Sequence, residues 1–301
     1  MQMMRKRWPL GTALAALITL FAACAFLLLS PASAPAQQPA KGDIVSIGGA
    51  VTEILYALDL GDRVAAVDTT SLYPRTVLKE KPNVGYMRAL SAEGVLSVPA
   101  KLILAAEGAG PPEAIAALKA SSTKFVTIPG LPSADGIVEK INAVAQATGK
   151  VQEGQALAAS VKSAFQQLNA KRQTIKKPLR TLFVLSVSSG RIMVGGKGTS
   201  ADGILTLAGA MNAAEKVNGF KPVSAEAIVA MEPDAIIVMK RRGTHGAERL
   251  QEMPAIKVLP AAKNKRIRAM DGLYLLGFGP RTPDAAQDVM NWLYPELKQK
   301  G

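Results

Sequence analysis

Short apolar segments of strand length alternate with helical segments on both sides of one long helical stretch, and this order constrains the fold more than any other feature. In the first half we expect strands at residues 43–48, 63–68, 102–106 and 124–128, a helix at 52–61 that ends at Gly61, and a helix at 112–120. Alternation of this kind is typical of parallel α/β architecture.

Residues 133–177 contain no proline and have helical periodicity, and the part from Val151 to Ile175 predicts one long helix of about 37 Å at about 1.5 Å per residue. A second α/β half follows. We expect its strands at 181–187 and 234–239 and a helix at 202–210. The chain therefore divides into an N-terminal lobe at 41–132, a helical connector at 133–177 and a C-terminal lobe at 178–301, after a leader at 1–36.

The leader has three parts in the order expected of an export signal. Three basic residues at 5–7 precede an uncharged apolar run at 10–29, and a stretch of small residues and prolines ends at Ala36. We expect cleavage near Ala36 and a periplasmic location. A retained anchor helix is the alternative, because about 20 apolar residues can span a bilayer. A lipoprotein anchored at Cys24 is less well supported, since the apolar run continues past the cysteine.

The scarcity of histidine and cysteine excludes two classes of protein. The chain has one His and one Cys, and cleavage near Ala36 removes the Cys, so disulfide scaffolds and zinc sites of His and Cys ligands are excluded. Cleavage also removes three basic residues, which leaves 33 Lys and Arg against 23 Asp and Glu, a formal charge of +10. The basic residues are scattered with few aromatics among them, so we expect no nucleic-acid binding and favour a small anionic ligand.

A short repeat relates the two halves. Residues 90–96 match residues 223–229, which places Glu93 and Glu226 at equivalent positions 133 residues apart. A Ser that precedes a Glu is typical of a helix start, where the helix dipole favours the acidic side chain. The two glutamates therefore either mark helix N-termini only or also contact a partner of matching symmetry.

Two loops of the first half are candidates for ligand contact. Residues 68–75 follow the second strand, at the strand end where open α/β sheets bind ligands, and Pro74 restricts Tyr73 to an extended conformation. Residues 82–88 again combine glycine, tyrosine and arginine. Taken alone, each loop is also compatible with an ordinary surface turn.

Four motifs together resemble the periplasmic hemin-binding proteins of ABC-type heme uptake systems. The motifs are Asp-Thr-Thr-Ser-x-Tyr-Pro at 68–74, Val-Gly-Tyr-Met-Arg-Ala-Leu-Ser-Ala-Glu-Gly at 84–94, Lys-Pro-Val-Ser-Ala-Glu at 221–226 and Leu-Tyr-Leu-Leu-Gly-Phe-Gly-Pro-Arg-Thr at 273–282. The resemblance covers residues 44–294. It implies a class III periplasmic binding protein, an α/β fold in which two Rossmann-like lobes are joined by one long backbone helix.

The resemblance also implies roles for individual residues. Tyr73 is the expected axial ligand of heme iron, and a phenolate is a suitable ligand for ferric iron. Arg75 is expected to bind a heme propionate. An arginine of the other lobe, Arg241 or Arg242, is expected to donate a hydrogen bond to the phenolate.

Other site residues are assigned with alternatives left open. Tyr86 is expected to contact the ligand. His245 is either a second iron ligand or an exposed loop histidine. Tyr274 and Arg281 belong to the last motif, which is as compatible with structural support as with ligand contact, and we leave them outside the expected site.

The function that the resemblance implies is that of a receptor without catalytic activity. It would bind hemin between its lobes and deliver it to a dimeric ABC permease through Glu93 and Glu226, and an outer-membrane heme receptor system is a further implied partner. The alternative within the same fold is a ferric-siderophore or cobalamin receptor. An exported hydrolase is disfavoured because the chain has no Gly-x-Ser-x-Gly motif and only His245 for a triad.

Overall fold

Runs of isoleucine, leucine, valine and alanine form the strands of two separate sheets in the computed structural model, which describes residues 42–188, 191–240 and 245–300. The leader predicted at 1–36 lies outside these residues. Within the described part of the chain, no helix is long and apolar enough to cross a membrane.

The first sheet is fully parallel and has the strand order β2-β1-β3-β4. Its strands are β1 (Ile44–Ile47), β2 (Val64–Val67), β3 (Leu102–Ala106) and β4 (Lys124–Ile128). Every residue of β1 and β2 is buried, which explains why, apart from Ser46, these strands are apolar runs rather than alternating ones. The helices of this half are α2 (Gly49–Ala57), α3 (Val77–Glu80), α4 (Ala92–Leu96) and α5 (Pro112–Ala120). All four predicted strands and the helix at 112–120 are confirmed.

The helix predicted at 52–61 is wrong at both ends. It begins at Gly49, directly after Gly48, whose φ of 111° is accessible to glycine. It ends at Ala57, because Asp59 enters the left-handed region with a φ of 59°. Gly61 instead opens the 3-10 turn η1 (Gly61–Arg63).

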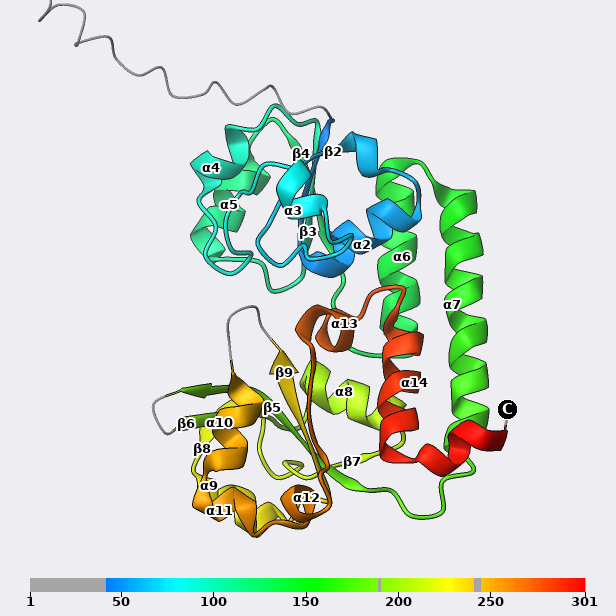
Figure 1. The fold of residues 1–301 in the computed structure, drawn as a ribbon. Helices are drawn as coiled ribbons and strands as arrows, with labels where there is room; N and C mark the ends of the chain where they lie inside the picture. The colour runs from blue at the N-terminus through cyan, green and yellow to red at the C-terminus, as the bar shows by residue number, and fades with distance from the viewer. Residues whose placement is uncertain (1–41, 189–190, 241–244, 301) are drawn as a thin grey trace, which may run out of the picture. The chain divides into compact units, whose positions relative to one another are not determined.

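The connector consists of two helices that lie side by side, α6 (Ala134–Thr148) and α7 (Val151–Arg172) (Figure 1). Ser133 caps α6, and Gly149 ends it with a φ of 78°. The two helices approach closely at Gly154, where a Cβ would overlap the methyl group of Ala145. The long helix predicted at 151–175 is therefore α7, which ends three residues earlier.

Contacts at the end of α6 and at the end of α7 tie the connector to both halves. The carbonyl of Thr148, the last residue of α6, accepts a hydrogen bond of 3.4 Å from Arg63, which follows α2. At the end of α7, Arg172 donates 3.2 Å to the carbonyl of Thr206 in α8 (Ser200–Leu207). At about 1.5 Å per residue, the 22 residues of α7 span roughly 33 Å between these points.

The second sheet is mixed and has the order β10-β9-β5-β6-β8. Its strands are β5 (Arg180–Ser188), β6 (Arg191–Gly195), β8 (Phe220–Val223), β9 (Ala235–Lys240) and β10 (Ile267–Asp271), with β7 (Met211–Asn212) paired to β5. Strands β10, β9 and β5 are parallel, whereas β6 and β8 are antiparallel to their neighbours. The remaining helices are α9 (Ala225–Met231), α10 (Gly246–Glu252), α11 (Pro254–Lys257), α12 (Pro260–Lys263), α13 (Gly272–Leu276), α14 (Thr282–Leu293) and the 3-10 helix η2 (Pro295–Lys300). The predicted strands at 181–187 and 234–239 correspond to β5 and β9, and the predicted helix at 202–210 corresponds to α8.

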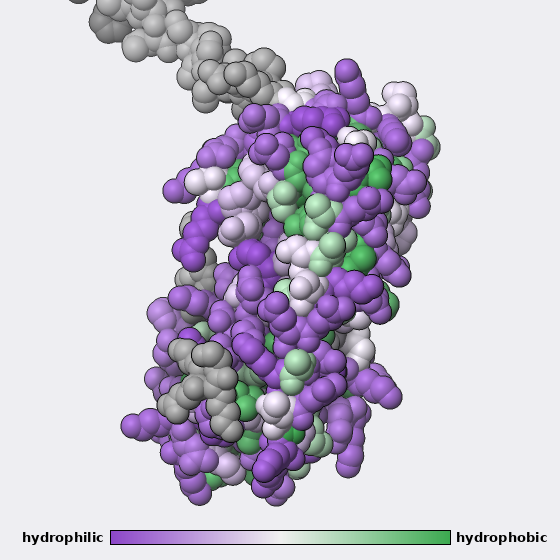
Figure 2. Space-filling view, turned by 90° about the vertical axis from the view of Figure 1, so that its right-hand side faces the viewer, coloured by the Kyte–Doolittle hydropathy of each residue, from purple (hydrophilic) through white to green (hydrophobic). Residues whose placement is uncertain are grey.

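The largest apolar cluster is continuous between the two halves. It includes Ile44 of β1, Ile141 of α6, Phe165 of α7, Phe183 of β5 and Val289 of α14, all of them buried. The side of the molecule on which α7 lies is covered mainly by hydrophilic residues, and hydrophobic ones appear there in small groups (Figure 2). On α7, Val161, Phe165 and Leu168 are therefore buried in the shared core, and the opposite face is mainly polar.

Candidate functional site

The loop that follows β2 is built around one buried carboxylate. Asp68 is fully buried and accepts hydrogen bonds from Gly48 N at 2.8 Å, Thr70 N at 2.9 Å, and the hydroxyls of Thr70 and Ser71 at 3.0 Å each. Hydrogen bonds to a charged acceptor are stronger than neutral ones. Asp68 therefore fixes the path of the backbone that leads to Tyr73.

Hydrogen-bonded hydroxyl groups also connect the same loop to α2 and β1. The hydroxyl of Thr52 on α2 lies 2.7 Å from that of Ser46 and 2.7 Å from that of Ser71. Gly49 at the start of α2 has no Cβ, and one placed there would overlap the carbonyl of Thr70. The loop thus lies directly against the N-terminus of α2.

The second predicted loop lies beside the first. Thr69 N donates 2.9 Å to the carbonyl of Gly85, which adopts a φ of 100°, and the side chain of Asn83 accepts 2.8 Å from Gly85 N. Tyr86 follows and is 46% exposed, and Tyr73 is 39% exposed. Two partly exposed phenol side chains therefore come from adjacent loops, each with its backbone fixed by internal hydrogen bonds.

The side chain that contacts Tyr73 in this structure is Arg281, which the sequence interpretation left outside the site. Its guanidinium carbon lies 3.6 Å from the centre of the Tyr73 ring and 5.3 Å from the centre of the Tyr274 ring. At the first distance a guanidinium interacts favourably with the π electrons of the ring. Arg281 belongs to the segment between α13 and α14, so residues of the first and last motifs meet.

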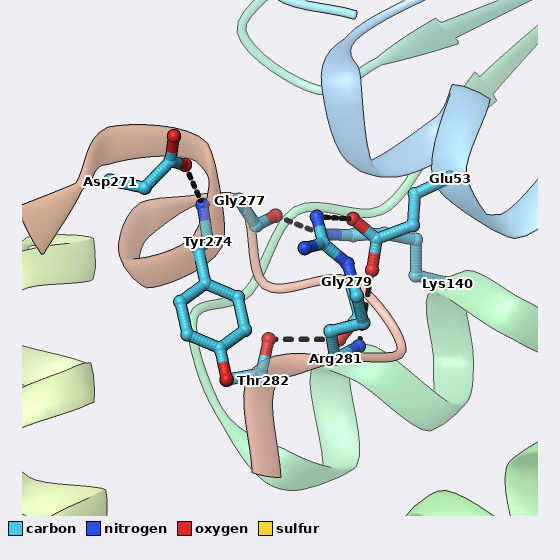
Figure 3. A network of polar contacts seen from close by, with 8 residues as sticks. All are labelled: Glu53, Lys140, Asp271, Tyr274, Gly277, Gly279, Arg281 and Thr282. Carbon is cyan, nitrogen blue, oxygen red and sulfur yellow. Dashed lines mark hydrogen bonds and ion pairs between the residues drawn. The ribbon is translucent and has the colours of Figure 1, made fainter. Parts of the chain in front are cut away.

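Arg281 is in turn bound by Glu53 of α2 (Figure 3). One carboxylate oxygen accepts 2.7 Å from Arg281 Nη2, and the other accepts 3.1 Å from its backbone N. The Glu53 side chain is 6% exposed and that of Arg281 27%. Removing Arg281 would leave the buried Glu53 carboxylate unpaired, which costs about 3–5 kcal/mol.

One donor of Arg281 has no partner. Among the residues that the structure describes, its Nε is the buried side-chain nitrogen or oxygen without a hydrogen bond. An unpaired buried donor costs about 1–3 kcal/mol. The guanidinium therefore contacts Glu53 and the Tyr73 ring in a position that leaves its Nε without a hydrogen bond.

A buried lysine completes the polar network under this segment (Figure 3). Lys140 of α6 donates 3.0 Å to the carbonyl of Phe278, a buried residue with a φ of 51°. Burial lowers the pKa of Lys140 to about 8, and the nearby charges of Glu53 and Glu107 oppose this shift. Gly279 permits the close packing, since a Cβ there would lie 3.0 Å from the Glu53 carboxylate.

Tyr274 lies in the same motif, with its ring centre 5.3 Å from the guanidinium carbon of Arg281. Its hydroxyl donates 3.0 Å to Asp288 of α14. Burial, followed by the negative charge of Asp288, raises the pKa of Tyr274. Tyr274 therefore stays a neutral phenol under ordinary conditions and contributes a ring face rather than an anion.

The structure locates the other predicted ligand contacts only in part. Arg75 is exposed two residues after Tyr73, at the edge of the same loop. His245 is exposed just before α10 and makes no side-chain cap to it. Arg241 and Arg242 lie outside the described residues, so their predicted contact with Tyr73 stays a prediction.

Glu93 and Glu226 occupy equivalent places, as the repeat predicts. Each lies in the first turn of a short helix, α4 or α9, whose preceding serine accepts a hydrogen bond of 3.2 Å from a backbone N of that turn. Both glutamates are exposed. Backbone and Ser224 hydrogen bonds lower the pKa of Glu226. The predicted helix starts are therefore confirmed, and contact of the two glutamates with a partner stays a prediction.

Among the described residues, no group of three or more His, Cys, Asp and Glu side chains is arranged to hold a metal ion. The two loops present the phenols of Tyr73 and Tyr86, both partly exposed. A phenol with an arginine against its ring suits a ligand that brings its own ferric iron together with negative charge.

Comparisons with known proteins find relatives along most of the chain. The family described as periplasmic binding protein matches residues 44–273. The apo form of the periplasmic heme-binding protein RhuT from Roseiflexus sp. RS-1 is 37% identical, with a TM-score of 0.80 over 85% of this chain and 99% of that one. The periplasmic heme-binding protein BhuT in complex with two hemes is 35% identical, with a TM-score of 0.79 over 85% and 98%. The vitamin B12-binding protein of Vibrio cholerae serotype O1 is 27% identical over 92% of this chain and 98% of its own length.

Proposed function

Since the chain belongs to the family of periplasmic binding proteins, we propose that it binds hemin between two lobes and delivers it to the permease of an ABC transporter. The fold is that of class III members of this family, two α/β lobes joined by a long backbone helix. The observation that carries the choice of hemin is Tyr73, a partly exposed phenol on a loop fixed by buried Asp68 and faced by an arginine.

The proposed binding mode assigns each side chain a chemical task. The phenolate oxygen of Tyr73 ligates the ferric iron. Arg75, exposed on the same loop, pairs with a propionate. Arg241 or Arg242 donates to the phenolate, and the exposed ring of Tyr86 packs on the porphyrin. His245 is exposed and is either a second iron ligand or a solvent-facing side chain.

A titration of the apo-protein with hemin, followed by absorption, tests the proposal. We expect saturable binding with a tyrosinate-type ferric spectrum, and loss of that spectrum in Tyr73→Phe. Tyr86→Phe is the matched control, because it removes another exposed phenol from the neighbouring loop and keeps its ring. Absence of saturable binding, or an unchanged spectrum in Tyr73→Phe, refutes the proposal. In His245→Ala, a changed spectrum assigns the histidine to the iron, and an unchanged one assigns it to the solvent.

Cobalamin is the second candidate ligand, because a vitamin B12-binding protein aligns over nearly the whole chain. Corrin binding does not need a phenolate on a ferric iron. Competition distinguishes the two: cyanocobalamin that displaces hemin, with an affinity unaffected by Tyr73→Phe, favours the corrin. A ferric siderophore used in the same competition tests the third ligand class of this fold.

We further propose that Glu93 and Glu226 dock the two lobes onto the two permease subunits. Their support is their equivalent, exposed positions on α4 and α9. Glu93→Lys and Glu226→Lys are expected to bind hemin normally and to fail in stimulating ATP hydrolysis by the reconstituted transporter. Stimulation at the level of the unmodified protein contradicts the docking role.

The proposed location follows from the leader and the family. Cleavage near Ala36 releases the protein into the periplasm, where an outer-membrane heme receptor system supplies hemin. Mass spectrometry of the exported protein tests this, because the mature N-terminus separates cleavage near Ala36 from a retained anchor and from lipidation at Cys24.

A further inference from the structure

Arg281 contacts the proposed iron ligand and is bound by a buried carboxylate at the same time. We propose that Arg281 is a positioning residue for Tyr73: its guanidinium covers one face of the phenol ring, and Glu53 fixes the guanidinium there. This inference rests on the proposed function, in which Tyr73 ligates heme iron. It adds Arg281, a residue to which the sequence motifs gave no role in ligand binding.

The position of the guanidinium is determined by two hydrogen bonds to one carboxylate. Glu53 accepts from both Arg281 Nη2 and Arg281 N, at 2.7 and 3.1 Å. Because side chain and backbone of the same residue are bound, the arginine can neither rotate away nor shift along the chain without breaking a bond. Gly279 allows this approach, since its missing side chain leaves room for the carboxylate.

The contact with Arg281 and the bond to iron use different parts of Tyr73. The guanidinium carbon lies 3.6 Å from the ring centre and therefore covers the π face. A phenolate binds a metal through oxygen lone pairs, which lie near the ring plane. Tyr73 is still 39% exposed as a whole residue with Arg281 in place, so the two interactions are compatible. A ring held on one face presents its oxygen in a defined direction, which favours one iron geometry.

The same contact joins segments that are far apart in the chain. Glu53 and Tyr73 belong to the first half, whereas Arg281 precedes α14, 228 residues after Glu53. A purely structural tie between these segments would affect folding stability and leave the iron environment as it is. A positioning residue affects the spectrum of the bound iron.

Three variants separate these roles. Arg281→Ala removes the guanidinium. Arg281→Lys keeps the charge but lacks the planar group, which in arginine both covers the ring and donates to Glu53. Glu53→Gln keeps the size and one acceptor oxygen, so it folds more readily than a truncation. Lys162→Ala is the matched control, since it removes one positive charge from an exposed position on α7.

Hemin titrations of these proteins, with thermal unfolding as a folding control, test the proposal. We expect Arg281→Ala to weaken hemin binding about tenfold, the size of one cation–π contact, and to shift the tyrosinate charge-transfer band. Arg281→Lys is expected to share the shifted band, Glu53→Gln to shift it less, and Lys162→Ala to match the unmodified protein.

The two proposals fail in different ways. An unmodified protein without a tyrosinate-type spectrum refutes the proposed function and this inference with it. An unmodified protein with that spectrum, unchanged in folded Arg281→Ala and in Glu53→Gln, refutes only the positioning role.

Discussion

Replacing Lys140 by methionine is expected to change how folding stability depends on pH. Lys140 is buried in α6 and donates to the carbonyl of Phe278, and burial lowers its pKa from 10.5 to about 8. The unfolded chain therefore holds its proton over a pH range in which the folded protein has lost it. Since stability rises with pH wherever the unfolded state binds more protons, the free energy of unfolding should increase from pH 8 to about 10.5.

The expected gain follows from the size of the shift. A difference between 10.5 and about 8 corresponds to about 3 kcal/mol at 1.36 kcal/mol per pKa unit. Below pH 8 Lys140 is protonated in both states, and the folded state carries the whole cost of burying its charge. Methionine fills a similar volume without a charge, but it leaves the Phe278 carbonyl without its donor, which costs about 1–3 kcal/mol. The variant is therefore expected to be similar to the unmodified protein at pH 7 and less stable at pH 10.

Urea unfolding at pH 7, 8, 9 and 10 measures this difference. Other lysines and tyrosines titrate in both proteins and cancel in the comparison. Lys162→Met, at an exposed position of α7, is the control and should show a constant difference across the series. A difference between Lys140→Met and the unmodified protein that stays constant from pH 7 to pH 10 refutes the reasoning.

Three further substitutions test the framework of the site by urea unfolding. Asp68→Ala leaves several buried donors unpaired and is expected to cost about 3 kcal/mol and to weaken hemin binding; normal binding would show that the loop does not need its carboxylate. Gly279→Ala places a methyl group 3.0 Å from Glu53 and should cost roughly 1–3 kcal/mol, whereas Gly94→Ala, with ordinary contacts, should be nearly neutral; equal effects would contradict the packing argument. Ser224→Ala removes the cap of α9 and should cost about 1 kcal/mol, and no loss would mean that the cap is not formed in solution.

Periodicity predicted most of the elements because it reflects burial of the same segments. The runs at 102–106 and 124–128 are strands with those bounds, because a short apolar run between polar turns is typical of a strand in a parallel sheet. The start of the helix at Gly49 was missed because two adjacent glycines are typical of a turn. Here Gly49 is needed for the close approach of the 68–75 loop, a contact between segments about 20 residues apart, and Gly48 is needed because a Cβ there would overlap the side chain of Ala106.

The antiparallel strands β6 and β8 were not predicted either. Their apolar runs are short, and they form a hairpin-like extension of the sheet instead of continuing the parallel alternation.

The part of the candidate site formed by residues close together in the sequence was predictable. Tyr73, Tyr86 and the two loops follow from motifs within 20 residues, and the structure places the loops side by side. The Arg281 contact was missed because it depends on Glu53, which lies 228 residues earlier. One signal was present: Glu53 is a charged residue among the apolar positions of a buried helix, and such a residue requires a partner.

The central claim is that the phenolate of Tyr73 ligates the iron of bound hemin. Resonance Raman spectra of the hemin complex, excited in the charge-transfer band, test this directly, because vibrations of a coordinated phenolate shift when the protein contains ring-deuterated tyrosine. We predict that these bands are present in the unmodified protein, shift on deuteration and are absent from Tyr73→Phe. A hemin complex without phenolate bands, or one that keeps them in Tyr73→Phe, would contradict the assignment.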